Sequence, residues 1–205
     1  MKTVFVQPER CVGCKQCEVA CAVAHSRSQD PFTALFEVPL PRSRIHVEPG
    51  LFLNTAFPNK CRHCNPAPCQ TVCPTGAISR APDLPEIVLI AADKCIACGM
   101  CAMVCPFDVI TFHAPQGVPY RQIVALKCDH CIERQRQGLI PACVEACKVN
   151  ALLFGEVNEL IKVARTRLAE TVSVAVSQVA PQAAGLPEHV EGWKAWGRDV
   201  ARVNA

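Results

Sequence analysis

Short apolar runs separated by polar and turn residues recur along the chain, and they predict short strands. Segment 44–57, RIHVEPGLFLNTAF, alternates in part between apolar and polar positions and is interrupted by the Pro-Gly pair at 49–50. It therefore predicts two short strands or a hairpin. The runs IVLI (87–90) and IVAL (123–126) each lead into a group of cysteines, and ALLFGEV (151–157) follows the last group. We expect each run to form a short strand that flanks a cysteine-rich loop.

The chain beyond residue 157 contains no cysteine and shows a different pattern. Between residues 158 and 171, apolar side chains recur at positions 160, 161, 163, 164 and 168, a spacing typical of a helix. Asn158 is the expected N-cap of this helix. Residues 157–205 are accordingly predicted to form a helical C-terminal extension, which either packs on the rest of the chain or docks a partner.

The composition limits the classes of protein that are compatible with this chain. The 205 residues suffice for one domain or for two small ones. The formal net charge of +3 is too small to indicate a nucleic-acid partner. No run of 18 apolar residues is present, so no transmembrane segment is expected, and the opening MKTVFVQPER lacks the apolar region of a signal peptide. We therefore expect a cytoplasmic protein; attachment to a membrane, or export, through a partner chain is also compatible with the sequence.

Sixteen cysteines fall into four groups of four, which span residues 11–21, 61–73, 95–105 and 128–147. Every group opens with C-x2-C and closes with C-x3-C, and only the gap between these two halves changes. The gap is two residues in groups one and three, four in group two and eleven in group four. The groups therefore form an internal repeat in which no cysteine is left over.

The spacing favours iron–sulfur clusters over the other uses of cysteine. C-x2-C-x2-C wraps three sulfurs around one metal centre, and in two-cluster ferredoxins the next cysteine, which precedes a proline, binds the other cluster. We therefore expect the groups to work in pairs and to hold four [4Fe–4S] clusters. Structural zinc sites would also use all the cysteines, but they usually join two separate C-x2-C pairs. Disulfides are disfavoured because they do not persist in a reducing compartment.

The four groups give the chain a resemblance to a known family. Residues 1–156, and in particular CRHCNPAPCQTVCPTGAI (61–78) and the group-four loop that ends in PACVEAC, resemble the four-cluster ferredoxin-like electron-transfer subunits of dimethyl sulfoxide reductase, formate dehydrogenase, nitrate reductase and hydrogenases. The resemblance implies an α+β fold of two stacked bacterial-ferredoxin-like modules with two [4Fe–4S] clusters each, followed by the helical extension. In this family groups one and four pair, as do groups two and three.

Carried over to this sequence, that pairing implies four sets of iron ligands. The first two sets are Cys11, Cys14, Cys17 and Cys147 (cluster 1) and Cys21, Cys128, Cys131 and Cys143 (cluster 2). The other two are Cys61, Cys64, Cys69 and Cys105 (cluster 3) and Cys73, Cys95, Cys98 and Cys101 (cluster 4). Every position of the four motifs is cysteine, so the resemblance implies four cubane clusters.

The resemblance also implies electron transfer between protein partners. Segments CEVACAVAHS (17–26) and LFEVPLPRSRIHVEPG (35–50) are most similar to the CooF-type iron–sulfur proteins, which accept electrons from nickel carbon monoxide dehydrogenase and pass them to a hydrogenase. The predicted donor is therefore a carbon monoxide dehydrogenase, and the predicted acceptor is a hydrogenase or a flavoprotein, within a hetero-oligomer. The alternative is an electron-transfer subunit of a formate dehydrogenase, a hydrogenase or a molybdenum reductase.

The sequence lacks the motifs of an independent substrate site. No G-x-G-x-x-G turn, G-x-S-x-G elbow or H-E-x-x-H helix is present, and the cluster assignment leaves no cysteine as a nucleophile. The chain is therefore predicted not to be an enzyme without its partners.

Two histidines lie inside cysteine loops, His63 in CRHC and His130 in CDHC. Packing of the loop is the expected role of both side chains. A hydrogen bond to cluster sulfur, or a proton-coupled role, is the alternative.

Overall fold

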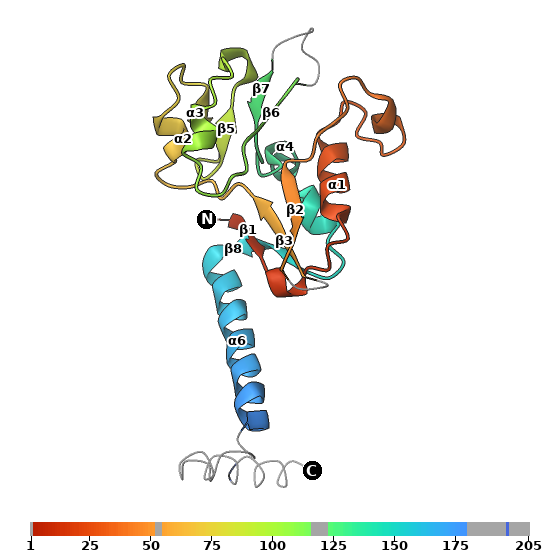
Figure 1. The fold of residues 1–205 in the computed structure, drawn as a ribbon, viewed down its shortest axis with the longest axis vertical. Coiled ribbons are helices and arrows are strands. Elements are labelled where there is room, and N and C mark those ends of the chain that lie inside the picture. The colour runs from red at the N-terminus through yellow and green to blue at the C-terminus, as the bar shows by residue number, and fades with distance from the viewer. Residues whose placement is uncertain (1, 52–54, 116–122, 180–195, 197–205) are drawn as a thin grey trace. The chain divides into compact units, whose positions relative to one another are not determined.

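Pairs of short antiparallel strands form the sheets of the described chain in the computed structural model (Figure 1). The structure describes all residues except 1, 52–54, 116–122, 180–195 and 197–205. The strand pairs are β1 (Lys2–Val6) with β8 (Leu152–Glu156), β2 (Ile45–Pro49) with β3 (Ala56–Lys60), β4 (Ile78–Arg80) with β5 (Val88–Ile90), and β6 (Thr111–His113) with β7 (Val124–Leu126).

The helices of the cysteine-containing region are equally short. They are α1 (Gln16–Ala24), α2 (Pro68–Thr71), α3 (Met100–Met103), α4 (Ile132–Arg136) and α5 (Ala142–Glu145), with 3-10 turns at Pro8–Arg10, Thr33–Phe36 and Ala92–Lys94. Four of them carry cysteines: Cys17 and Cys21 lie in α1, Cys69 in α2, Cys101 in α3 and Cys143 in α5. Helix α1 packs against α5, and α2 packs against α3, so helices from different cysteine groups meet in pairs.

The first and last strands of this region lie side by side. Their register runs from Lys2 opposite Glu156 to Val6 opposite Leu152, and Gln7 continues the pairing through an N–H···O bond of 2.8 Å to Ala151. Because group one follows β1 and group four precedes β8, this sheet brings the two groups together.

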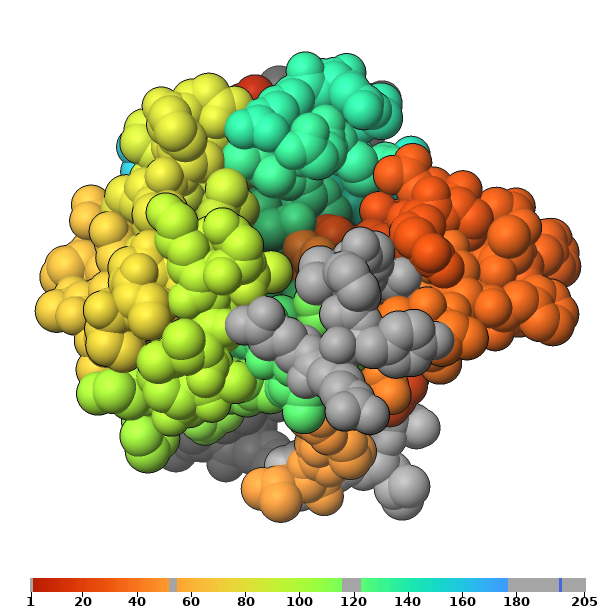
Figure 2. Space-filling view, turned by 90° about the horizontal axis from the view of Figure 1, so that it is seen from above, coloured from red at the N-terminus to blue at the C-terminus, as the bar shows by residue number. Residues whose placement is uncertain are grey.

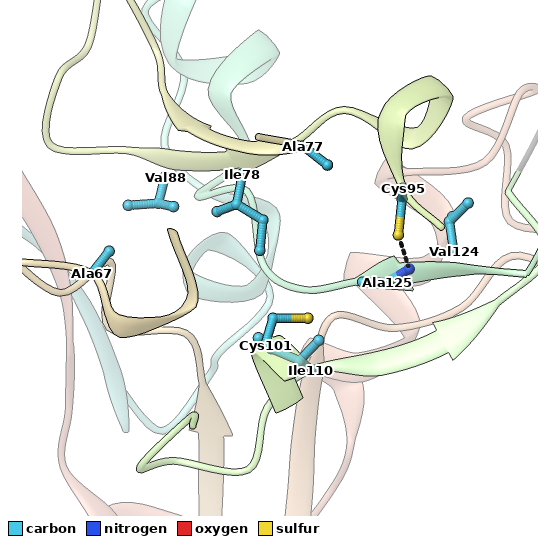
Figure 3. Close-up of a cluster of buried hydrophobic side chains, with 9 residues drawn as sticks. All are labelled: Ala67, Ala77, Ile78, Val88, Cys95, Cys101, Ile110, Val124 and Ala125. Atoms are coloured by element: carbon cyan, nitrogen blue, oxygen red, sulfur yellow. Dashed lines mark hydrogen bonds between the residues drawn. The ribbon is translucent and has the colours of Figure 1, made fainter. Parts of the chain in front are cut away.

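Two cores contain the buried apolar residues beside the cysteine groups. The core that joins groups one and four contains Val4, Cys17, Cys21, Ile45, Val47, Ala56, Cys143 and Leu152. The core that joins groups two and three contains Ala67, Ala77, Ile78, Val88, Cys95, Cys101, Ile110, Val124 and Ala125 (Figure 3). Cysteines are thus part of both cores, and the packing depends on the same side chains as the candidate chemistry.

A third set of contacts joins these two cores. Ile87, which precedes β5, is fully buried against Ile132 of α4. Arg136 of α4 also holds Asp83 through two N–H···O bonds of 2.8 and 2.9 Å, and this hydrogen bond lowers the pKa of Asp83 to about 2. The segment between groups two and three is therefore fastened to the helix that follows the first half of group four.

The strands predicted at 44–57, 87–90, 123–126 and 151–157 are confirmed as β2 with β3, β5, β7 and β8. The predicted helix is also confirmed and is longer than expected, since α6 runs from Val157 to Val179. The prediction that Asn158 caps α6 is wrong, because the helix starts directly after β8 and Asn158 lies in its first turn. Strands β1, β4 and β6 were not predicted from the sequence.

The chain divides into two compact units, residues 1–157 and residues 158–205. In the second unit, no side chain between positions 158 and 176 is buried. No helix among the described residues has the length and apolar character that crossing a membrane requires.

We expect Ile87→Ala to destabilise the first unit by about 2–5 kcal/mol, because it removes a fully buried side chain at the contact between the two cores. Ile123→Ala, at a side chain that is 54% exposed, is the matched control and should change stability by less than about 0.5 kcal/mol. Anaerobic urea unfolding of the holoprotein, followed by circular dichroism, measures both. Equal effects of the two substitutions would contradict the packing described here.

Candidate iron–sulfur sites

The third residue of the C-x2-C motif that opens each group has the same unusual backbone conformation. Its φ angle is +69° at Gly13, +50° at His63, +54° at Ala97 and +61° at His130. Only glycine adopts positive φ without strain, so three of the four positions hold a conformation that is costly for their side chains. Strain of this kind persists where a site requires it, and left-handed turns direct successive backbone N–H groups inward. The repeat found in the sequence is therefore also a repeat of backbone shape.

Two cavities are each lined by four cysteines. The first is lined by Cys61, Cys64, Cys69 and Cys105. The second is lined by Cys73, Cys95, Cys98 and Cys101. In both cavities three cysteines come from one group and the fourth comes from the other. Three of these eight, Cys61, Cys95 and Cys101, are buried.

Five of the remaining cysteines gather around the other core, and Cys128 is buried with Cys61 and Val109. Cys17 and Cys21 of α1 are buried with Cys143 of α5, and Cys11 and Cys147 pack against them. Burial raises the pKa of Cys17 to about 12, and the nearby Cys11 and Cys147 add to this increase. Burial also raises the pKa of Cys143, with further contributions from Cys128, Cys21 and Cys131. Cys14 is exposed, as is its counterpart Cys98 in group three.

None of the sixteen cysteines forms a disulfide, and burial raises the pKa of several of them. Burial raises the pKa of Cys131 to about 12 and that of Cys128 to about 11. A buried thiol with such a pKa is inert as a nucleophile at neutral pH. It becomes a thiolate when a metal ion replaces its proton, so metal binding is the chemistry that these side chains favour.

Backbone N–H groups donate to cysteine sulfurs in all four groups. The donors and acceptors are Arg44 to Cys21 (3.3 Å), His63 to Cys61 (3.4 Å), Ala125 to Cys95 (3.4 Å, dashed in Figure 3), His130 to Cys128 (3.3 Å) and Ala151 to Cys147 (3.2 Å). Such bonds stabilise negative charge on sulfur and tune the potential of a bound cluster. The donor set of four converging thiols with N–H groups around them thus fits a [4Fe–4S] cluster.

An ion pair that the sequence did not reveal lies beside Cys21. His25 Nε2 is 2.9 Å from Asp129 Oδ1, and Arg44 Nη1 donates to the other oxygen of Asp129 at 2.5 Å. Burial lowers the pKa of His25, but the hydrogen bonds to Asp129 and Cys21, together with the charge of Asp129, outweigh burial and raise it to about 10. The His25 ring also lies 3.7 Å from the sulfur of Cys21, so a positive charge accompanies that sulfur.

The distance between these residues in the sequence explains why the pair was missed. Asp129 and His25 are 104 positions apart, and no repeated motif contains His25. The only indication in the sequence was the acidic residue Asp129 inside the CDHC loop, and it did not indicate which residue Asp129 would contact.

Comparisons with known proteins agree with this chemistry. Residues 53–157 match the family model described as "4Fe-4S dicluster domain", and residues 8–24 match a "4Fe-4S binding domain". The chain is 41% identical to an "Iron-sulfur protein" of Rhodospirillum rubrum over 157 residues, which cover 73% of this chain and 79% of the relative. It is 37% identical to "Electron transport protein HydN" of Escherichia coli K12 over 166 residues, which cover 77% and 89%.

A third relative is the "Probable anaerobic dimethyl sulfoxide reductase chain YnfG" of Escherichia coli K12, with 32% identity over 161 residues, which cover 76% of this chain and 74% of the relative. The site and these matches define an iron–sulfur electron-transport protein. The chain belongs to the 4Fe–4S dicluster family. Its sixteen cysteines fit four [4Fe–4S] clusters, and a bound cluster supplies one-electron exchange without a proton or a substrate bond.

Proposed function

We propose that residues 1–156 conduct electrons through four clusters in a line, between a redox enzyme and a protein acceptor. The observation that carries this proposal is the pair of cavities in which three cysteines of one group meet one cysteine of another. Exchange of the fourth cysteine places two clusters close together inside each pair of groups. Two stacked bacterial-ferredoxin-like modules, with groups one and four in one and groups two and three in the other, are the architecture that this exchange supports.

The ligands proposed for the four clusters follow from that exchange. They are Cys11, Cys14, Cys17 and Cys147 for cluster 1; Cys21, Cys128, Cys131 and Cys143 for cluster 2; Cys61, Cys64, Cys69 and Cys105 for cluster 3; and Cys73, Cys95, Cys98 and Cys101 for cluster 4. The cavities support the last two sets, and the electrostatic neighbours of Cys17 and Cys143 support the first two.

Clusters 1 and 4 are the proposed ends of the line. Their loops contain the two exposed cysteines, Cys14 and Cys98. Exposed apolar side chains adjoin both, with Val12 59% exposed and Ile96 61% exposed. Exposed apolar surface beside a redox centre suits docking of a protein that gives or takes electrons. Residues 157–205 are proposed as an extension outside this path.

The proposed donor is a carbon monoxide dehydrogenase and the proposed acceptor a hydrogenase or a flavoprotein, in a cytoplasmic hetero-oligomer. Support comes from the resemblance of residues 17–26 and 35–50 to iron–sulfur proteins of such systems. The alternative is an electron-transfer subunit of a formate dehydrogenase, a hydrogenase or a molybdenum reductase, and the similarity to a probable dimethyl sulfoxide reductase chain supports the last of these. In either case the chain serves as a carrier and its partners perform the substrate chemistry.

A projecting apolar segment is the proposed contact with the donor. Phe32, Leu35, Phe36 and Val38 are between 69% and 86% exposed, and the orange part of the chain that includes them projects at the side of the molecule in Figure 2. Asp30 holds the turn by accepting the N–H of Thr33 at 2.8 Å. A fixed apolar projection of this kind marks a protein interaction site.

The ligand exchange is tested by Cys105→Ser. Although Cys105 belongs to group three, its loss should damage the cluster of Cys61, Cys64 and Cys69 and leave the cluster of Cys95, Cys98 and Cys101 intact. Cys101→Ser, four residues earlier, is the matched control and should damage the other cluster. Iron analysis should fall from about 16 to about 12–15 per chain in both variants, because each touches one cubane. Electron paramagnetic resonance that places both lesions in the same cluster would refute the exchange.

The donor is tested by mixing the oxidised protein with carbon monoxide dehydrogenase and carbon monoxide under anaerobic conditions. The proposal expects rapid bleaching of the clusters, slowed at least about tenfold in the double variant Leu35→Ser/Phe36→Ser because apolar anchors dominate docking. Leu51→Ser is the control, because this side chain is 99% exposed but lies outside the projecting segment. This variant should react like the wild type. Reduction by formate dehydrogenase alone would reassign the donor and leave the carrier function in place.

A further inference from the structure

The five-position pattern Lys-Cys-x-His-Cys occurs twice, once in each of the proposed modules, where the two modules meet. Lys60-Cys61 and His63-Cys64 in group two correspond to Lys127-Cys128 and His130-Cys131 in group four. The lysines and histidines of both copies are buried, with exposed fractions of 1% for Lys60, 4% for Lys127, 9% for His63 and 3% for His130. Ionisable side chains are rarely buried to this extent without a function or a partner.

The two histidine rings lie on each other. Their centroids are 5.0 Å apart and their planes differ by 29°, and the ring of Phe154 meets that of His130 nearly at a right angle, with centroids 5.7 Å apart. His63 lies between two ligands proposed for cluster 3, and His130 lies between two ligands proposed for cluster 2. The stack is therefore a direct contact between the loops of the two central clusters, beside the buried core that contains Cys61 and Cys128.

Hydrogen bonds within the described part of the chain satisfy only one of the four ring nitrogens of the stack. His63 Nδ1 accepts the N–H of Val88 at 3.0 Å, which fixes the tautomer of His63 with its proton on Nε2. That Nε2, and both ring nitrogens of His130, are buried without a partner among the described residues. A neutral imidazole always carries one N–H, so this pair holds two buried donors that have no protein acceptor.

The neighbouring lysines cannot accept these protons. Lys60 Nζ donates to the carbonyl of Cys61 at 3.1 Å, and Lys127 Nζ donates to the carbonyls of Cys128, at 3.1 Å, and of Val88. An imidazole carries at least one N–H whether it is neutral or charged, so both rings are donors.

We propose that His63 and His130 donate these N–H groups to the sulfur atoms of clusters 3 and 2, and so set the potentials at the midpoint of the electron path. The inference rests on the proposed function, because it uses the cluster ligands assigned there. A hydrogen bond to sulfur stabilises the reduced cluster, which carries one more negative charge, and therefore raises its potential. The histidines are tuning residues and not iron ligands.

The test replaces each donor while keeping a ring in the stack. His63→Phe should lower the potential of cluster 3, and His130→Phe that of cluster 2. At a fixed potential the ratio of reduced to oxidised cluster should fall about tenfold, which corresponds to about 59 mV for a one-electron couple. His113→Phe in β6, outside the cysteine loops, is the matched control and should leave all potentials unchanged. Dye-mediated titration of the full-length holoprotein, followed by electron paramagnetic resonance, gives the potentials without any partner enzyme.

Unchanged potentials in variants with full iron content would overturn the proposal and leave loop packing as the role of the stack. If a variant fails to assemble its cluster, a spectroscopic measurement on the wild-type protein tests the proposal instead. In protein labelled with ¹⁵N-histidine, pulsed electron paramagnetic resonance of reduced cluster 3 should show coupling to ring nitrogen that is lost in His63→Phe, and absence of that coupling in the wild type would also overturn the proposal. Cluster 2 is not used for this readout, because His25 also lies beside its proposed ligand Cys21. An incorrect donor assignment would be detected separately in the enzyme assay above. An incorrect set of cluster ligands would be detected in the cysteine variants.

Discussion

The constraint on which this structure depends is that sulfurs from distant parts of the chain must converge. Strands of three to five residues in two-stranded sheets, and helices of four to nine residues, are too short to form a stable core by themselves. Cysteine side chains occupy the middle of both cores, and the loops around them hold positive φ at equivalent positions. The elements are therefore best understood as supports that bring four thiols together at each site, and the β1–β8 sheet closes the chain around groups one and four.

Charge compensation is the second requirement. An oxidised [4Fe–4S] core of about +2 with four thiolates adds about −2 to the protein, and four clusters add about −8. The chain places its buried cations where the proposed central clusters meet. Lys60 and Lys127 are buried there, and His25 with its raised pKa lies beside Cys21. Buried positive charges that would be costly alone become favourable beside a cluster. The formal +3 of the sequence thus reflects internal compensation more than attraction to an external partner.

The sequence predicted those parts of the site that depend on the local spacing of residues. The four cysteine groups, the cofactor class and the strands beside Val88, Val124 and Leu152 followed from repeats and apolar runs. The pairing of groups did not follow from spacing and needed a family resemblance. The His25–Asp129 pair and the His63–His130 stack were out of reach, because each joins residues more than 60 positions apart and no local spacing indicates that they meet. Strand β1 was missed because its partner lies at the other end of the same unit.

The most direct test of the central claim is anomalous diffraction at the iron absorption edge from anaerobically grown crystals. The account requires four iron cubanes in a line, each held by three cysteines of one group and one of its paired group. The two central cubanes should lie on either side of the His63–His130 stack. Four cubanes that each draw all their ligands from a single group would contradict the exchange, and single-metal centres without sulfide would contradict the assignment of iron–sulfur clusters.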